Sequence, residues 1–202
     1  MIAAEALTGL ILAGGEGRRM GGRDKGLEPF EGLPLFAHAS KRLEGRVDDI
    51  LVSANRHQDA YALFGVRVIE DIESGFHGPL MGLYSALRAA TTPWLLMLPC
   101  DTPLLPEDLV ERMSTDIGDH PVAIAFDGER DHPTVALVST ALVEDLGAFL
   151  ARGERKLGHW FARHDPKRID FSNEREAFIN LNSEEEKQRL ELRRADDRRK
   201  AP

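Results

Sequence analysis

The sequence predicts a three-layer α/β fold in which a mostly parallel sheet carries helices on both faces. Between residues 8 and 113, short apolar runs typical of buried parallel strands alternate with segments of helical period. In the C-terminal half, two apolar runs flank Asp127-Gly128-Glu129-Arg130-Asp131, which predicts an inserted β-hairpin with a long turn. The 202 residues fit a single domain, 1–202, that forms a full core without disulfides or structural metal.

The elements of the first half follow in regular order. Thr8–Ala13 is a short apolar run closed by Gly14-Gly15, and it is the first predicted strand. Pro34 suits the first turn of a helix that extends to Leu43, because a missing N–H costs little there. The remaining strands are Asp49–Ala54, Val66–Ile69 and Trp94–Leu98, and the remaining helices are His57–Phe64, Gly78–Ala90 and Pro106–Met113.

The second half begins with the two hairpin strands. Ser183, with Glu186 three residues later, forms a capping box and predicts the start of a last helix. The charged segment 191–202 is expected to fray. The predicted strands are Val122–Phe126, Thr134–Val138, Arg168–Phe171 and Phe178–Leu181, and the predicted helices lie near Ala141–Ala151 and Lys156–Arg163.

Composition narrows the class of protein. A net charge of −8 argues against nucleic acid and membrane surfaces as partners, although it permits a local basic pocket. The single cysteine, Cys100, excludes a disulfide within the chain and fits a reducing compartment. No stretch has the pattern of a signal peptide or of a membrane span. We therefore expect a cytoplasmic protein.

Polar residues or glycines follow four consecutive predicted strands. They are Gly14-Gly15, Ala54-Asn55, Glu70-Asp71 and Cys100-Asp101. In open α/β sheets, ligands bind outside the carboxyl ends of the strands. The sequence therefore predicts a binding site at this edge.

The glycine-rich loop after the first strand is typical of phosphate binding. A dinucleotide fingerprint needs a third glycine where the chain has Met20, and a Walker A loop needs Ser or Thr where Lys25 is followed by Gly26. A third arrangement fits: backbone N–H groups wrap a nucleoside triphosphate while Arg19 and Lys25 neutralise its charge.

The loop is similar to the signature of nucleotidyltransferases with a Rossmann-like fold, through Leu12-Ala13-Gly14-Gly15, Arg19-Met20-Gly21 and Lys25. The order of the later blocks resembles, more narrowly, the molybdenum cofactor guanylyltransferase (MobA) family over about residues 8–190. Those blocks are Ala54-Asn55-Arg56-His57-Gln58, Ile69-Glu70-Asp71, Gly78-Pro79-Leu80 with Gly82, Pro99-Cys100-Asp101-Thr102-Pro103, the segment 127–134, and Asn180-Leu181-Asn182.

The resemblance implies transfer of GMP from GTP to molybdenum-bearing molybdopterin, with release of pyrophosphate and use of Mg²⁺. It implies that residues 1–115 mainly hold the nucleotide and residues 116–190 the acceptor, with molybdoenzyme apoproteins or their chaperones as further partners. By the same resemblance, Arg19, Lys25 and Asp101 are catalytic, and Asp101 binds the metal. The nucleotide-binding residues are Leu12, Ala13, Gly14, Gly15, Lys25, Ser53, Asn55, Asp71 and Asp101, and the acceptor-binding residues are Gly78, Gly82, Asn180 and Asn182.

Other interpretations remain open at this stage. Ser53 stands where the family often has Asn, so a hydroxyl replaces an amide at that contact. Asp101 and Asp71 are also compatible with turns or caps, and His132 with a structural place in the hairpin. Two alternative functions compete with guanylyl transfer. One is a cytidylyltransferase acting on the same pterin or on another phosphate-bearing acceptor; the other is a non-catalytic adaptor that binds GTP or the cofactor.

Overall fold

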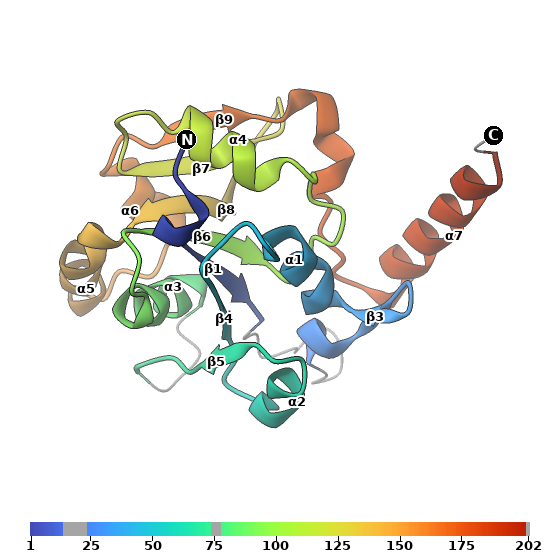
Figure 1. The fold of residues 1–202 in the computed structure, drawn as a ribbon, viewed down its shortest axis with the longest axis horizontal. Coiled ribbons are helices and arrows are strands. Elements are labelled where there is room, and N and C mark those ends of the chain that lie inside the picture. The colour runs from blue at the N-terminus through green and yellow to red at the C-terminus, as the bar shows by residue number, and fades with distance from the viewer. Residues whose placement is uncertain (14–23, 74–77, 201–202) are drawn as a thin grey trace.

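The computed structural model of the chain describes residues 1–13, 24–73 and 78–200. One seven-stranded sheet dominates it (Figure 1). From edge to edge, the strands are β5 (Arg67–Ile69), β4 (Asp49–Ser53), β1 (Leu7–Leu12), β6 (Trp94–Pro99), β8 (Asp131–Ser139), β7 (Val122–Phe126) and β9 (Lys167–Asp170). β8 runs antiparallel to both of its neighbours, and the other pairings in this sheet are parallel. The mostly parallel sheet and the inserted hairpin are confirmed.

Helices cover both faces of this sheet, as predicted. On one face lie α1 (Leu35–Leu43) and α4 (Leu109–Asp116), and on the other lie α3 (Pro79–Ala89), α5 (Val143–Ala151) and α6 (Leu157–Ala162). Each face has its own hydrophobic cluster. Because successive strand residues point to opposite faces, Ile11 belongs to the first cluster and Leu10 to the second.

The hairpin of β7 and β8 is longer than the sequence predicts. β8 begins at Asp131 rather than Thr134, so only residues 127–130 form the turn. Ala125 pairs with His132 and Ile124 with Ala136, which leaves residues 133–135 as a bulge. Pro133 cannot donate to the ladder, and such residues are typical of bulges.

A small hairpin after the glycine-rich loop was not predicted. A 3₁₀ turn, η3 (Lys25–Leu27), leads into β2 (Pro29–Phe30) and β3 (Leu33–Pro34). Glu31 and Gly32 both have positive φ, at 46° and 82°, as a two-residue hairpin turn requires. Because Pro34 belongs to β3, helix α1 begins at Leu35, one residue later than predicted.

The prediction of a strand at Phe178–Leu181 is wrong. Residues Ser172–Phe178 form a 3₁₀ segment, η5, and the chain then runs past the loop that follows β6. There Leu181 N–H donates to Asp101 O at 2.8 Å, and among the described residues this segment joins no strand ladder. Helix α4 also begins later than predicted, at Leu109 rather than Pro106.

The last helix, α7 (Glu184–Lys200), starts at the predicted capping box. Glu186 N–H donates to Ser183 Oγ at 3.2 Å, and Ser183 N–H donates to Glu186 Oε2 at 3.1 Å. The helix projects away from the sheet and keeps its helical backbone through the charged segment as far as Lys200 (Figure 1). Beyond the middle of the helix, Arg194 pairs with Glu31 of the β2–β3 turn at 2.8 Å. In the described ranges, no helix is long and apolar enough to span a membrane.

Candidate active site

The carboxyl ends of the parallel strands bring the predicted residues to one edge of the sheet. Ala13 follows β1, Asn55 follows β4, Asp71 follows β5 and Asp101 follows β6. The turn after β7 lies at the same edge, because β8 runs antiparallel to both β6 and β7, so β7 runs in the same direction as β6. Gly14, Gly15 and Arg19 fall in 14–23, outside the described residues.

Lys25 is the centre of the predicted catalytic group. Its Nζ donates to Asp101 Oδ2 at 2.6 Å and to Asn182 Oδ1 at 2.9 Å. The Lys25 and Asp101 side chains are 21% and 17% exposed, so the pair is reachable yet partly shielded from water. An ammonium group carries three donors, and within the described residues two of them are used. Among the described residues, the third N–H has no acceptor.

Asp24 fixes the backbone that carries Lys25, a role that the sequence pattern does not indicate. Its Oδ1 accepts Gly26 N–H at 3.1 Å and the Tyr61 hydroxyl at 2.5 Å. Its Oδ2 lies 3.2 Å from His57 Nδ1. Burial, followed by the hydrogen bond to Asp24, raises the pKa of Tyr61 above its ordinary value, so the phenol stays protonated and donates.

Asn55 and Asp71 form a reciprocal pair beside β4 and β5. Asn55 Nδ2 donates to Asp71 Oδ2 at 2.8 Å, and Asp71 N–H donates to Asn55 Oδ1 at 2.9 Å. Both ends of the amide are thus used to orient the carboxylate. The structure brings together two residues that the sequence assigns to the nucleotide.

Ser53 and Gly82 are packed against each other. Ser53 is 3% exposed, and its carbonyl accepts Ala13 N–H at 3.0 Å. A Cβ on Gly82 would lie 2.8 Å from Ser53 Oγ and 3.0 Å from Leu12 Cδ2, so a close approach of α3 to β1 and β4 requires glycine there. Gly82 therefore packs against Leu12 and Ser53. Gly78 precedes α3 with φ of +79°, a conformation that favours glycine.

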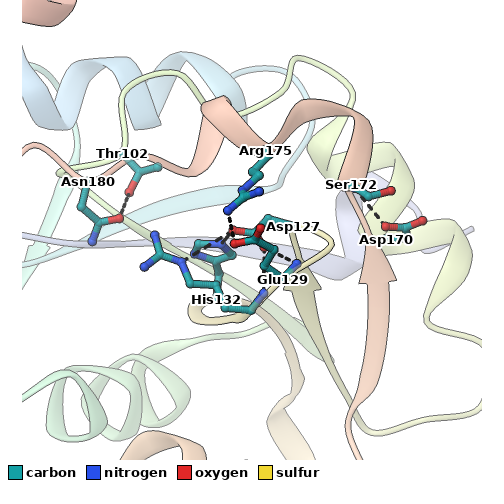
Figure 2. A network of polar contacts seen from close by, with 9 residues as sticks. Thr102, Asp127, Glu129, His132, Asp170, Ser172, Arg175 and Asn180 are labelled. Carbon is teal, nitrogen blue, oxygen red and sulfur yellow. Dashed lines mark hydrogen bonds and ion pairs between the residues drawn. The ribbon is translucent and has the colours of Figure 1, made fainter.

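A cavity of about 350 Å³ adjoins the Lys25 group. Asn182 belongs to both, because it lines the cavity and accepts from Lys25. Thr102 Oγ1 donates to Asn180 Oδ1 at 3.3 Å and so links the cavity wall to the loop after β6 (Figure 2). The cavity is lined by Arg130, Asp131, His132, Pro133, Thr134, Ile179, Asn180 and Asn182. A larger cavity, of about 640 Å³, lies beside α6 and β9 and is lined by none of the predicted site residues.

A buried polar network joins His132, which lines this cavity, to Asp127 of the β7–β8 turn (Figure 2). Asp127 is 4% exposed, and its Oδ1 accepts the N–H groups of Glu129 and Arg130 at 2.9 and 2.8 Å. Its Oδ2 lies 2.7 Å from His132 Nε2. Burial by itself would raise the pKa of Asp127, but the Arg130 N–H, the His132 side chain and the nearby positive charges hold it below its ordinary value. Asp127 is therefore an ionised carboxylate.

The chemistry of the group suits a divalent metal together with a phosphate. In the described part of the chain, no three His, Cys, Asp or Glu side chains form a metal cluster. Mg²⁺, however, is commonly held by one or two carboxylates together with substrate phosphates and water, and Asp101 provides such a carboxylate beside Lys25. Cys100, in contrast, is buried, and burial with the adjacent Asp101 raises the pKa of its thiol, which disfavours the nucleophilic thiolate.

Comparison with known proteins gives a consistent result. The family model of the MobA-like NTP transferase domain matches residues 9–168. Proteins named molybdenum cofactor guanylyltransferase from Shewanella sediminis and Shewanella loihica are 45% and 46% identical over 186 residues, which is 91% of this chain and 95% of each relative.

Solved structures share the fold. The molybdopterin-guanine dinucleotide biosynthesis protein A from Archaeoglobus fulgidus superposes with a TM-score of 0.76 at 18% identity, covering 94% of this chain and 99% of that one. The 4-diphosphocytidyl-2C-methyl-D-erythritol synthase from Anaerococcus prevotii gives 0.72 at 12% identity, covering 94% and 96%. Two relatives whose names refer to different bases thus share this architecture, so the fold alone does not determine which nucleotide is bound.

Proposed function

This chain belongs to the MobA-like NTP transferase family, and we propose that it transfers GMP from GTP to the phosphate of molybdenum-bearing molybdopterin. One bond forms, between an oxygen of the acceptor phosphate and the α-phosphorus of GTP. One bond breaks, between that phosphorus and the oxygen that leaves with pyrophosphate. The observation that carries the proposal is the Lys25–Asp101–Asn182 group beside a polar cavity, in a chain 45% identical to guanylyltransferases.

Lys25 acts as the phosphate-binding cation. Its remaining N–H donates to a phosphate oxygen, and a charge-assisted bond of this kind stabilises the negative charge that pyrophosphate carries away. Asn182 holds the ammonium group in place from the acceptor side. Arg19, together with the backbone of Ala13, Gly14 and Gly15, completes the phosphate site in this proposal.

Nucleotidyl transfer in this family generally uses a divalent metal ion, and we assign it as Mg²⁺ held by Asp101. When bound, the ion supplies positive charge that polarises the phosphate oxygens. The acceptor is itself a phosphate monoester, whose second pKa is near 6, so it is largely dianionic at neutral pH without help from a general base. The work of this chain's residues is therefore positioning and charge neutralisation.

The nucleoside and the acceptor occupy different parts of the edge. Asp71, oriented by Asn55, binds the nucleoside, and the packed Leu12, Ser53 and Gly82 form the floor beneath it. Asn180, Asn182 and Gly78 face the acceptor. Residues 1–115 thus mainly hold GTP and residues 116–190 mainly hold molybdopterin. The product passes to molybdoenzyme apoproteins or their chaperones in the cytoplasm.

Replacing Asp101 by Ala separates this proposal from a non-catalytic adaptor. For a catalyst, D101A abolishes turnover while retaining measurable GTP binding by calorimetry, because Lys25 and the nucleoside contacts remain. Wild-type protein that binds GTP and molybdopterin but releases no pyrophosphate would instead identify an adaptor. Asp101→Asn is the matched variant, since it keeps the size of the side chain and removes its charge.

A further inference from the structure

One nitrogen of the His132 ring, Nε2, contacts Asp127, and the other, Nδ1, is not used in that contact. Asp127 is ionised and can only accept, so His132 Nε2 carries the hydrogen in their 2.7 Å contact. The ring is also stacked on Phe178, with centroids 4.7 Å apart and an interplanar angle of 32°. These two contacts fix both the orientation of the imidazole and the protonation of Nε2.

The second nitrogen, Nδ1, makes no hydrogen bond within the described residues. The His132 side chain is 9% exposed, and His132 lines the cavity together with Asn180 and Asn182. A nearly buried polar atom is costly unless a protein group, a water or a ligand bonds to it. Pro133 and Thr134, in the bulge after His132, line the same cavity, so the sheet is locally distorted beside this histidine.

The charges around the imidazole are compensated. Arg130 Nε lies 3.6 Å from Asp127 Oδ2, and together with His132 it balances that carboxylate. Asp131 is bound by Arg168 of β9 through two contacts, at 2.8 and 3.0 Å. Glu129 of the turn is paired with Arg175, and Phe178, which stacks on the ring, and Asn180, which lines the same cavity, are neutral. The cavity therefore offers polar atoms without an unbalanced carboxylate, which suits an anionic acceptor with a nitrogen heterocycle.

We propose that His132 Nδ1 hydrogen-bonds the heterocyclic part of the acceptor, and that Asp127 acts as the positioning residue behind it. This inference rests on the proposed function, since it assigns a contact to the same acceptor. Asn182, at the end of the cavity next to Lys25, marks the phosphate end, and His132 lies on the wall beyond it. His132 is thus a binding and specificity residue for the acceptor and has no role toward GTP.

Two substitutions of similar size separate binding from structure. His132→Gln reaches Asp127 with its amide nitrogen but has nothing at the position of Nδ1. His132→Asn places an amide near the position of Nδ1 but cannot reach Asp127. We expect H132Q to keep the stability and the KM for GTP while its KM for molybdenum-bearing molybdopterin rises about tenfold, the equivalent of one hydrogen bond. H132N should lose stability and show a smaller rise in that KM.

If His132 is purely structural, H132Q keeps the wild-type KM for both substrates, and that result overturns the inference. Histidine ¹⁵N NMR of the wild-type protein provides a test that needs no folded variant. Added molybdopterin should shift the Nδ1 resonance of His132, whereas GTP should not. An Nδ1 resonance that stays unchanged when molybdopterin is added also overturns the inference. Wild-type protein that forms no guanine dinucleotide contradicts the proposed function instead, and the NMR result still decides the role of His132.

Discussion

Gly26 and Tyr61 provide the sharpest test of how the loop holds Lys25. A Cβ on Gly26 would lie 2.3 Å from Tyr61 Oη, 3.2 Å from Tyr61 Cζ and 3.1 Å from Ala13 Cβ. The Tyr61 side chain is fully buried, and its hydroxyl is bound to Asp24 at 2.5 Å, so it has no open space into which to move. Gly26→Ala must therefore displace the phenol from Asp24.

The expected cost has two parts. Losing a hydrogen bond to a charged group costs roughly 1.5–3 kcal/mol. Crowding a well-packed site costs about 1–3 kcal/mol. We expect G26A to lower the free energy of unfolding by about 3 kcal/mol and Tyr61→Phe to lower it by about 2 kcal/mol, from the lost hydrogen bond alone.

The double variant tests the mechanism. The Y61F side chain lacks the oxygen that collides with the methyl group added by G26A. G26A should therefore cost only about 1 kcal/mol in the Y61F background, and the two effects should be strongly non-additive. Gly158→Ala is the control: nothing lies within 4 Å of its added Cβ in helix α6, so it should stabilise the protein by up to about 1 kcal/mol. Urea unfolding of the four variants measures all of these changes. Additive effects of G26A and Y61F would refute the proposed collision.

Three further predictions concern the charged groups and the last helix. Lys25→Ala should weaken GTP binding in calorimetry and slow turnover, each by about 2 kcal/mol, because a charge-assisted phosphate contact is lost; unchanged values would remove Lys25 from the phosphate site. Because the folded-state pKa of Asp127 is depressed, its ionised form contributes stability above the unfolded pKa of about 3.9, and that contribution disappears as the pH falls through the folded pKa. The stability difference between wild type and Asp127→Asn should therefore shrink in urea unfolding below about pH 4, and a difference independent of pH would contradict this. Ser183→Ala should destabilise the start of α7 by about 1 kcal/mol, measured by amide exchange in its first turn, whereas unchanged protection would show that the capping box contributes nothing.

The order of strands and helices was predictable because it depends on local period. The observed strand β7 has the predicted bounds, Val122–Phe126, because this apolar run is long enough to show a pattern. The two-residue strands β2 and β3 are too short to show any period, and only Gly32 hinted at their turn. Phe178–Leu181 is a short, mostly apolar run of the kind that predicts a strand, yet a tertiary contact holds it at Asp101, and such contacts leave no local signal.

In the candidate site, too, some features were predictable from the sequence and others were not. Asp101 was predictable as a strand-end carboxylate, and the topology rule placed it at the ligand edge. The contact of Lys25 with Asn182 joins residues 157 positions apart, so only the fold reveals it. Asp24 could not be predicted as a supporting residue because its partner Tyr61 comes from a different element, helix α2 (Gln58–Ala62). His132 and Asp127 lie close in sequence, but both side chains are buried, and that burial is a property of the fold that the sequence does not show.

The most direct test of the account is pyrophosphate release by the purified protein with molybdenum-bearing molybdopterin and Mg²⁺, comparing GTP with CTP. We predict pyrophosphate and molybdopterin guanine dinucleotide with GTP and neither pyrophosphate nor a dinucleotide with CTP. Turnover with CTP alone, or with neither nucleotide, would contradict the assignment of this chain as a guanylyltransferase.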